Sequence, residues 1–211
     1  MTDLDDFSRA ALDNYLALVR EHAPMLTALD EQSGDGDFGH NLSYGIERGA
    51  ERALTAPDSE VWRSLAAVFL DEVGGTSGPL FGLLFQEIAR ASSSAQSPED
   101  LIGVGTSNGL AAVQRVGEAE VGDRTIVDAL HPASVALSRG GKLNSAAEAA
   151  CRGALDTAHL RARRGRASYV GERAVGHPDP GAVGVALLFV ACATATGAGE
   201  PSAFRELTDA R

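Results

Sequence analysis

Several residue types are scarce in this 211-residue chain, and each scarcity removes a class of structure. Only two cysteines occur, Cys151 and Cys192, and both stand in alanine-rich stretches without CxxC spacing or a nearby histidine. This pattern predicts buried thiols of a reducing cytoplasm and no zinc site. Aromatic residues make up 5% of the chain, and no segment shows the period-2 alternation of Val, Ile, Tyr and Phe that indicates strands. A sheet-based fold therefore has little support.

Basic residues are also few. The chain has 18 Lys and Arg against 29 Asp and Glu, and Lys142 is its sole lysine. Nucleic acids and anionic membranes both bind through a basic surface, so neither is expected as the main partner. If such an acidic chain binds phosphates, divalent cations should supply much of the positive charge.

A long apolar run and a secretion signal are likewise missing. The longest apolar run, residues 182–196, is shorter than the roughly 20 residues that a spanning helix needs, and it predicts a buried helix. The first residues include Asp3, Asp5 and Asp6, which do not fit the basic start of a signal peptide. We expect a cytoplasmic protein without a membrane span.

Helical periodicity is what the sequence has in abundance. Leu4, Phe7, Ala11, Tyr15 and Leu18 recur at the i, i+3/i+4 spacing that places side chains on one helix face. Residues 80–88 repeat this pattern, and further helices are expected at 42–54, 61–70, 101–116, 126–136, 146–162 and 182–195. With 44% hydrophobic residues, the chain is predicted to form one all-α domain over residues 1–211, with about eight helices.

The first segment with chemical content is LDEQSGDGDFGHN, residues 29–41. Asp30, Asp35 and Asp37 are three carboxylates within eight residues, separated by glycines that let the chain turn them toward one point. Carboxylates without cysteine or clustered histidine suit a hard cation, Mg²⁺ or Ca²⁺. A calcium-binding EF-hand does not fit, because the fifth and twelfth positions counted from Asp35 are glycine and isoleucine. The alternative that these aspartates only form turns and cap the next helix stays open.

Two further segments combine glycine with polar residues. In GGTSGPL, residues 74–80, small residues and a proline precede a helix, which is typical of a helix N-terminus that binds phosphate. It is not a Walker A loop, because no GK[ST] occurs, and a tight turn between helices is the alternative. In residues 165–182, Asp179 and Pro180 predict the N-cap and first position of the last helix. Arg166 there is either a surface charge or a stabiliser of phosphate charge.

These segments, together with TIVDALHPA at residues 125–133, resemble in order and content the L subunit family of dihydroxyacetone kinases. The resemblance implies a barrel of eight antiparallel helices with a nucleotide held by the loops at one end. It also implies that Asp30, Asp35 and Asp37 hold two Mg²⁺ ions that bridge to the phosphates of ADP or ATP. These aspartates and Arg166 are the catalytic residues that the resemblance predicts.

The nucleotide contacts that the resemblance implies come from all of these segments. They are Phe38, Gly39, His40, Asn41, Thr76, Ser77, Gly117, Ile126, Arg166, Asp179, Pro180 and Gly181. The chain departs from the family at Phe38, where many members have histidine. This change leaves the three aspartates intact and alters the surroundings of the phosphates.

The resemblance further implies phosphoryl transfer to dihydroxyacetone or a related small hydroxyketone held by a separate K subunit. Such transfer needs positioning and charge neutralisation more than covalent chemistry, so no nucleophile is required of this chain. The donor is either exchanging ATP or bound ADP that a phosphotransferase-system phosphocarrier rephosphorylates, and the sequence does not separate these versions. A homodimer is also left open. The alternative function is a Mg-nucleotide-loaded module that regulates a transcription factor or serves a fatty acid kinase type partner.

Overall fold

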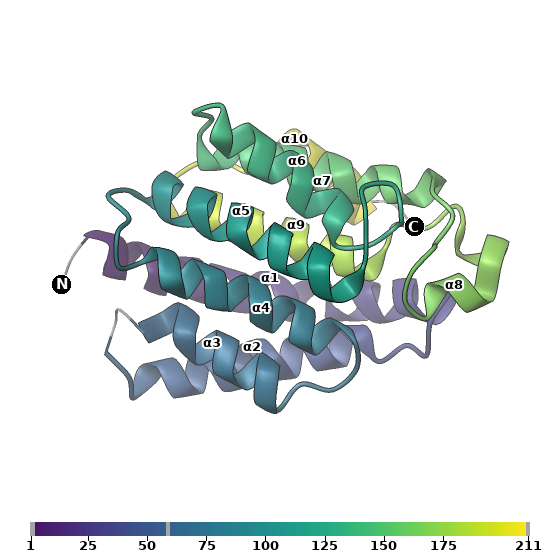
Figure 1. Ribbon diagram of the computed structural model, residues 1–211, viewed down its shortest axis with the longest axis horizontal. Coiled ribbons are helices and arrows are strands. Elements are labelled where there is room, and N and C mark those ends of the chain that lie inside the picture. Colours follow the sequence, from purple (N-terminus) through teal and green to yellow (C-terminus); the bar gives the residue numbers. More distant parts are fainter. Residues whose placement is uncertain (1–2, 58–59, 210–211) are drawn as a thin grey trace.

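A computed structural model of the chain describes residues 3–57 and 60–209, and over these residues every regular element is helical (Figure 1). The α-helices are α1 (Asp3–Ser33), α2 (Phe38–Leu54), α3 (Val61–Asp71), α4 (Ser77–Ala91), α5 (Pro98–Gly117), α6 (Val127–Ser138), α7 (Leu143–Asp156), α8 (Ala167–Val170), α9 (Pro180–Ala195) and α10 (Ser202–Asp209). Two 3-10 turns, η2 (Thr157–His159) and η3 (Gly171–Ala174), flank α8. The predicted all-α fold is confirmed.

Eight of the described helices close into a barrel (Figure 1). Each helix from α1 to α6 packs against the next, α7 packs against α9, and α9 returns to pack against α1. Because consecutive helices in such a ring run in opposite directions, every second connection lies at the same end. The α1–α2, α3–α4, α5–α6 and α7–α9 connections therefore share one end of the barrel, on the right in Figure 1.

Helix α9 forms the most apolar wall of the barrel. Every residue from 180 to 193 is buried, because α1, α6 and α7 contact the helix and α10 covers part of it. This confirms the buried helix that the apolar run predicted. Cys192 on α9 and Cys151 on α7 are both buried, and burial raises the pKa of each thiol to about 12. No helix in the described ranges is long and apolar enough to cross a membrane.

Glycines allow neighbouring helices of the barrel to approach closely. A Cβ added at Gly49 of α2 would lie 2.5 Å from Cδ2 of Leu65 on α3. A Cβ added at Gly105 of α5 would lie 2.6 Å from the Cα of Ile88 on α4. At both crossings the absence of a side chain sets the distance between the helices, which brings the walls of the barrel into dense packing.

Several helix boundaries differ from the sequence prediction. The helix expected at 146–162 ends as an α-helix at Asp156, because the buried Thr157 hydroxyl accepts a hydrogen bond from the Asp179 backbone N–H (2.7 Å) and the chain turns there. Helix α10, which is only eight residues long, was missed by the sequence prediction. Asp179 does cap α9: its side chain accepts a hydrogen bond from the Ala182 N–H at 2.8 Å, and Pro180 follows at the first position.

Two glycines of α5 offer a matched test of this packing. Gly105→Ala should lower the free energy of unfolding by about 1–3 kcal/mol, because the new methyl group would overlap backbone atoms of α4. Gly103→Ala should leave it unchanged or raise it by up to about 1 kcal/mol, because its Cβ would only make an ordinary 3.5 Å contact with Leu137. Urea denaturation of both variants measures the difference. Equal effects would contradict the close α4–α5 contact.

Candidate functional site

The four connections at one end of the barrel surround a cavity of about 140 Å³. The α1–α2 region contributes Asp30, Ser33 and Phe38, and the α3–α4 region contributes Thr76, Ser77 and Leu80. The α5–α6 region contributes Val113, Gly117, Ala119, Arg124, Thr125, Ile126 and Val127. The α7–α9 region contributes Arg164, Gly165, Arg166, Ala167, Asp179, Pro180 and Gly181.

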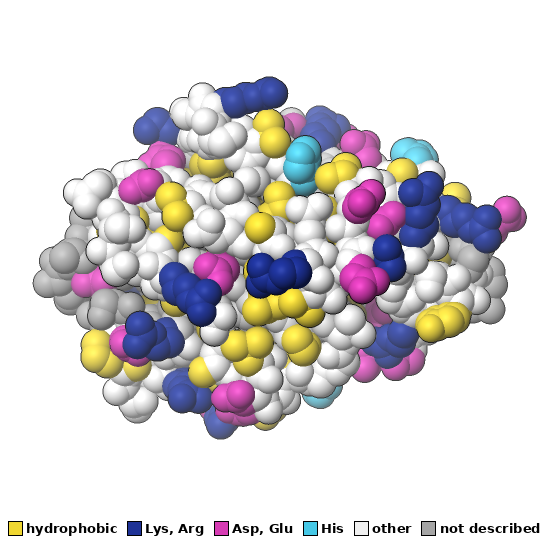
Figure 2. Space-filling model, viewed as in Figure 1, with side chains coloured by type: hydrophobic (Ala, Val, Ile, Leu, Met, Phe, Trp, Pro, Cys, Tyr) yellow, Lys and Arg dark blue, Asp and Glu magenta, His cyan; other side chains and the backbone are white. Residues whose placement is uncertain are grey.

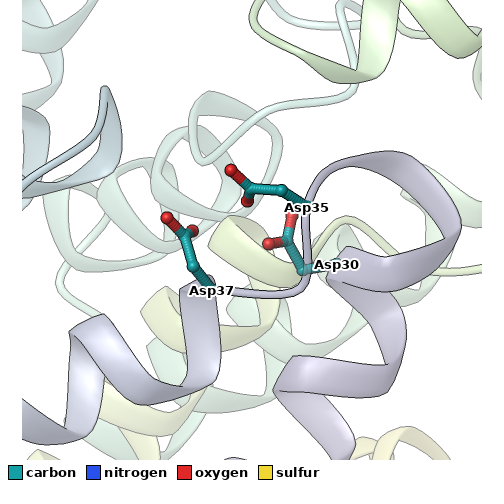
Figure 3. Close-up of side chains that lie close together, drawn as sticks. All are labelled: Asp30, Asp35 and Asp37. Atoms are coloured by element: carbon teal, nitrogen blue, oxygen red, sulfur yellow. The ribbon is translucent and has the colours of Figure 1, made fainter.

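Three carboxylates converge at the rim of this cavity (Figure 3). Asp30 comes from the last turn of α1, and Asp35 and Asp37 come from the connection to α2. One oxygen of each lies within 4.8 Å of the others. Asp30 is buried, whereas the side chains of Asp35 and Asp37 are 56% and 42% exposed. The donor set is all oxygen and carries three negative charges, which fits Mg²⁺.

The local backbone explains why the three side chains meet. Gly36 has a φ of +78°, which lets the chain reverse between Asp35 and Asp37. A Cβ at Gly34 would displace the Asp30 carboxylate from its present position. The Asp30 carboxylate in turn accepts a hydrogen bond from the Phe38 N–H at 3.2 Å, which ties α1 to the start of α2.

Helix capping does not explain the three aspartates. Asp37 occupies the N-cap position of α2, yet its side chain makes no capping hydrogen bond. Its carboxylate instead pairs with the Arg166 guanidinium at 2.9 Å, and Asp35 pairs with the same guanidinium. Arg166 thus reaches across from the α7–α9 connection and supplies one positive charge to three carboxylates. The remaining negative charge favours a cation at this point.

The N-terminus of α4 opens toward the cavity. Thr76 is the N-cap residue, and its hydroxyl makes no capping hydrogen bond. Thr76 and Ser77 therefore present two hydroxyls and the free N–H groups of a first helical turn to the cavity, an arrangement that suits an anion. The alternative of a tight turn explains Gly78, whose added Cβ would collide with the Val73 carbonyl. It does not explain the two hydroxyls.

The opposite walls of the cavity are apolar and close together. Leu80, Val113 and Ile126 line them, and Pro180 and Gly181 begin α9 beside them. A Cβ at Gly181 would lie 2.6 Å from Cγ2 of Ile126, so a larger residue there would narrow the cavity. These surfaces can hold a flat apolar group next to the polar rim.

Most of the predicted site residues line the cavity or, like Asp35 and Asp37, lie at its rim, but Gly39, His40 and Asn41 do neither. A Cβ at Gly39 would collide with α1 near Ala23 and Thr27, His40 is exposed, and Asn41 is half-buried on α2. Contact of these three residues with phosphate stays a prediction. The Phe38 ring is 5% exposed and packs against Phe81, with ring centroids 6.2 Å apart. At position 38, where the chain departs from the family, the Phe38 side chain is thus part of the core next to the cavity.

A buried charge cluster in the wall of the cavity was not predicted from the sequence. Arg124 is 1% exposed, and its Nη2 donates to the carbonyl oxygens of Ala174 (3.0 Å) and His177 (2.9 Å). Burial lowers the pKa of Arg124, and Asp179, with Oδ2 3.9 Å from Nη1, opposes that shift. Burial also raises the pKa of Asp179 to about 6, against the attraction of Arg124. No periodicity marks Arg124, which immediately precedes the 125–133 motif.

Comparison with known proteins identifies the family. A family model described as the DAK2 domain matches residues 32–194. The chain is 33% identical over 193 residues to the ADP-binding subunit DhaL of PEP-dependent dihydroxyacetone kinase 1 from Listeria innocua, a match that covers 90% of this chain and 96% of that protein. The chain belongs to the dihydroxyacetone kinase L subunit family. The family that the sequence motifs indicated is thereby confirmed, and the chain is a subunit of a kinase-type phosphotransferase.

Other members of this family are similar to the chain over comparable lengths. The DhaL subunit of Escherichia coli is 33% identical over 195 residues, which cover 84% of this chain and 92% of that protein. The L-erythrulose 1-kinase of Mycolicibacterium smegmatis is 34% identical over 86% of this chain and 34% of that larger protein. The crystal structure of the dihydroxyacetone kinase from C. freundii in complex with AMP-PNP and Mg²⁺ shares the fold, with a TM-score of 0.70, 24% identity, and coverage of 92% of this chain and 34% of that one.

The raised pKa of Asp179 predicts a pH dependence of stability. Its ordinary pKa of 3.8 rises to about 6 in the folded chain, so the folded state holds this proton more tightly than the unfolded state does. Relative to Asp179→Asn, the native chain should therefore lose up to about 3 kcal/mol of unfolding free energy as the pH rises from about 4 to about 6. Urea denaturation of both proteins at several pH values measures this difference. A difference that stays constant with pH would contradict the burial of this carboxylate.

Proposed function

We propose that this chain binds ADP or ATP with Mg²⁺ and serves as the nucleotide-binding subunit of a dihydroxyacetone kinase type system. The observation that carries the proposal is the convergence of Asp30, Asp35 and Asp37 beside a cavity that also receives the open N-terminus of α4. A site for an Mg-nucleotide needs both elements. The name of the Listeria innocua relative, an ADP-binding subunit, supports the same ligand.

The polar rim of the cavity is the proposed phosphate end. Asp30, Asp35 and Asp37 would hold Mg²⁺, with two ions proposed from the family resemblance. When bound, Mg²⁺ neutralises the charge of the phosphates and fixes their orientation. Thr76 and Ser77 would donate hydrogen bonds to phosphate oxygens from the start of α4, where the helix dipole favours negative charge.

The apolar walls of the cavity are the proposed adenine end. Gly117 and Ile126 lie on one side, and Pro180 with Gly181 lie on another. Their apolar surfaces suit the flat faces of a purine. The nucleotide would thus extend from a dry pocket to the carboxylates at the rim.

Arg166 has the position of a residue that acts on the transferred group. Its guanidinium already lies against Asp35 and Asp37, and its side chain is 42% exposed, so it can reach a phosphate at the same point. A guanidinium there would stabilise the charge that develops on the phosphoryl group during transfer. Residues of this chain then position the phosphates and neutralise their charge, and no covalent intermediate on the chain is required.

We propose that the acceptor is dihydroxyacetone or a related small hydroxyketone bound by a separate K subunit. The carboxylates and Arg166 lie at an exposed rim, where a partner can present a hydroxyl group to the terminal phosphate. The phosphoryl donor is either ATP that exchanges freely or bound ADP that a phosphocarrier rephosphorylates. The relatives from Listeria innocua and Escherichia coli are named PEP-dependent, which supports the second route.

Nucleotide exchange separates the two donors. The chain is loaded with radiolabelled Mg-ADP and mixed with excess unlabelled Mg-ATP, and release is followed by filtration. Release slower than turnover of the complete kinase supports rephosphorylation of bound ADP. Release faster than turnover, with ATP consumed in the presence of a K subunit alone, supports ATP as the donor.

Asp35→Asn tests the proposed Mg-nucleotide site. Removing one carboxylate charge should weaken Mg-ADP binding at least 100-fold, on the order of 3 kcal/mol, because the metal loses a charged ligand. Far-UV circular dichroism should not change, since the Asp35 side chain is exposed. Isothermal titration calorimetry with Mg-ADP makes the measurement.

The matched control is Asp13→Asn, which removes an exposed carboxylate near the middle of α1, distant in sequence from the site. It should bind Mg-ADP like the native chain. Tight binding by Asp35→Asn, or equal losses in both variants, would overturn the metal assignment.

A further inference from the structure

The segment that carries Arg166 to the carboxylates is long and contains only short helical elements. Residues 163–177, called the arm here, run from η2 toward α9 and contain only the short elements α8 and η3 (Figure 1). Tyr169 on α8 is 89% exposed, so the middle of the arm packs little against the barrel. The position of Arg166 therefore depends on how the two ends of the arm are attached.

The first end of the arm is attached to Asp123 in the α5–α6 connection. The Asp123 carbonyl accepts a hydrogen bond from the Arg163 N–H at 3.1 Å. Its carboxylate, which is 7% exposed, pairs with the guanidinium groups of Arg163 (3.5 Å) and Arg164 (3.6 Å). Figure 2 shows basic and acidic side chains gathered toward the right of the molecule, where Figure 1 places α8.

The second end of the arm is attached to the next residue, Arg124. Its Nη2 donates to the carbonyls of Ala174 and His177, three residues apart, and so fixes the direction of the chain where it leaves η3. Two consecutive residues of one connection thus contact both ends of the arm, and at the second end the Gly176 N–H also donates to the Ala158 carbonyl at 2.8 Å. The connection itself is fixed by the buried Asp128, whose carboxylate accepts hydrogen bonds from the N–H groups of Gly122 and Thr125 (2.8 Å for Thr125).

The properties of Arg124 are unfavourable for stability alone. It has a φ of +62°, a backbone conformation that non-glycine residues rarely adopt. Its Nε and Nη1 are buried without a hydrogen-bond partner, and the nearest carboxylate oxygen, Oδ2 of Asp179, is 3.9 Å from Nη1. An apolar side chain would fill the same space without unpaired donors. The two carbonyl hydrogen bonds are what an apolar side chain could not supply.

We propose that Arg124 is a positioning residue that acts through Arg166. By holding the carbonyls of Ala174 and His177 it would keep the arm closed over the rim, so that the Arg166 guanidinium meets the phosphates of the bound nucleotide. This inference rests on the proposed Mg-nucleotide function and adds a residue to it. Arg124 itself would not touch the transferred phosphoryl group.

A double-mutant cycle on the full chain tests the coupling. Mg-ADP affinity is measured by calorimetry for the native chain, Arg124→Gln, Arg166→Gln and the double variant. Each single change should weaken binding about tenfold. In the Arg166→Gln background, Arg124→Gln should cost less than a further twofold, because there is no longer a guanidinium for the arm to position.

Three results would overturn the inference. One is a double variant whose fold loss of Mg-ADP affinity equals the product of the two single losses, which would mean that Arg124 acts independently of Arg166. Another is native affinity in Arg166→Gln, which would leave Arg124 nothing to position. The third is a native chain that does not bind Mg-ADP, which removes the proposed function as well, whereas the first two leave that function standing.

Limited trypsin digestion without nucleotide gives an independent measurement of the arm. Arg124→Gln should speed cleavage after Arg164 and Arg166 at least fivefold at a temperature where the variant is fully folded, because one end of the arm loses two of its hydrogen bonds. Cleavage after Arg90, on α4, is the internal control and should keep its native rate. Unchanged cleavage in the arm would contradict the attachment.

If Arg124→Gln does not fold, Asp123→Asn replaces it in the same cycle. This change removes the carboxylate that pairs with Arg163 and Arg164 and keeps the backbone hydrogen bond to Arg163. Its loss of Mg-ADP affinity should likewise disappear in the Arg166→Gln background. A loss that persists there would overturn the role of the arm.

Discussion

The contact between α9 and α1 closes the barrel, and the site depends on that closure. Because the first and last long helices are neighbours, the α1–α2 and α7–α9 connections lie side by side although they are more than 100 residues apart in sequence. Arg166 can reach Asp35 and Asp37 only in this arrangement. The burial of α9 over residues 180–193 provides the apolar area that holds the ring closed.

Because neighbouring helices run in opposite directions, the two ends of the barrel carry different connections. One end collects the Asp30, Asp35 and Asp37 carboxylates and the uncapped N-terminus of α4, and these groups are open to a ligand there. The glycine-dependent contacts along the walls, such as Gly105 against Ile88, keep the helices close enough for these connections to meet. A dense wall and a polar rim are thus two consequences of one packing arrangement.

The charged side chains at the rim and those in the wall of the cavity lie in different surroundings. At the rim, Asp35 and Asp37 are solvated and paired with one guanidinium, so a metal ion can compete for them. In the cavity wall, Arg124 and Asp179 are buried. Burial lowers the pKa of Arg124 and raises the pKa of Asp179, which favours the neutral form of each group. The first arrangement suits ligand exchange, and the second suits a fixed scaffold, because separating the pair would leave each group buried without its partner.

The sequence by itself determined the helical class, the eight main helices, the cap at Asp179 and the grouping of Asp30, Asp35 and Asp37, because local periodicity and short spacings encode these features. Only the tertiary structure decided that Arg166 meets those carboxylates, that Gly39, His40 and Asn41 lie off the cavity, and that Arg124 holds the arm. Each of these depends on contacts between residues distant in sequence. Such contacts arise when the barrel closes, and no local pattern records them.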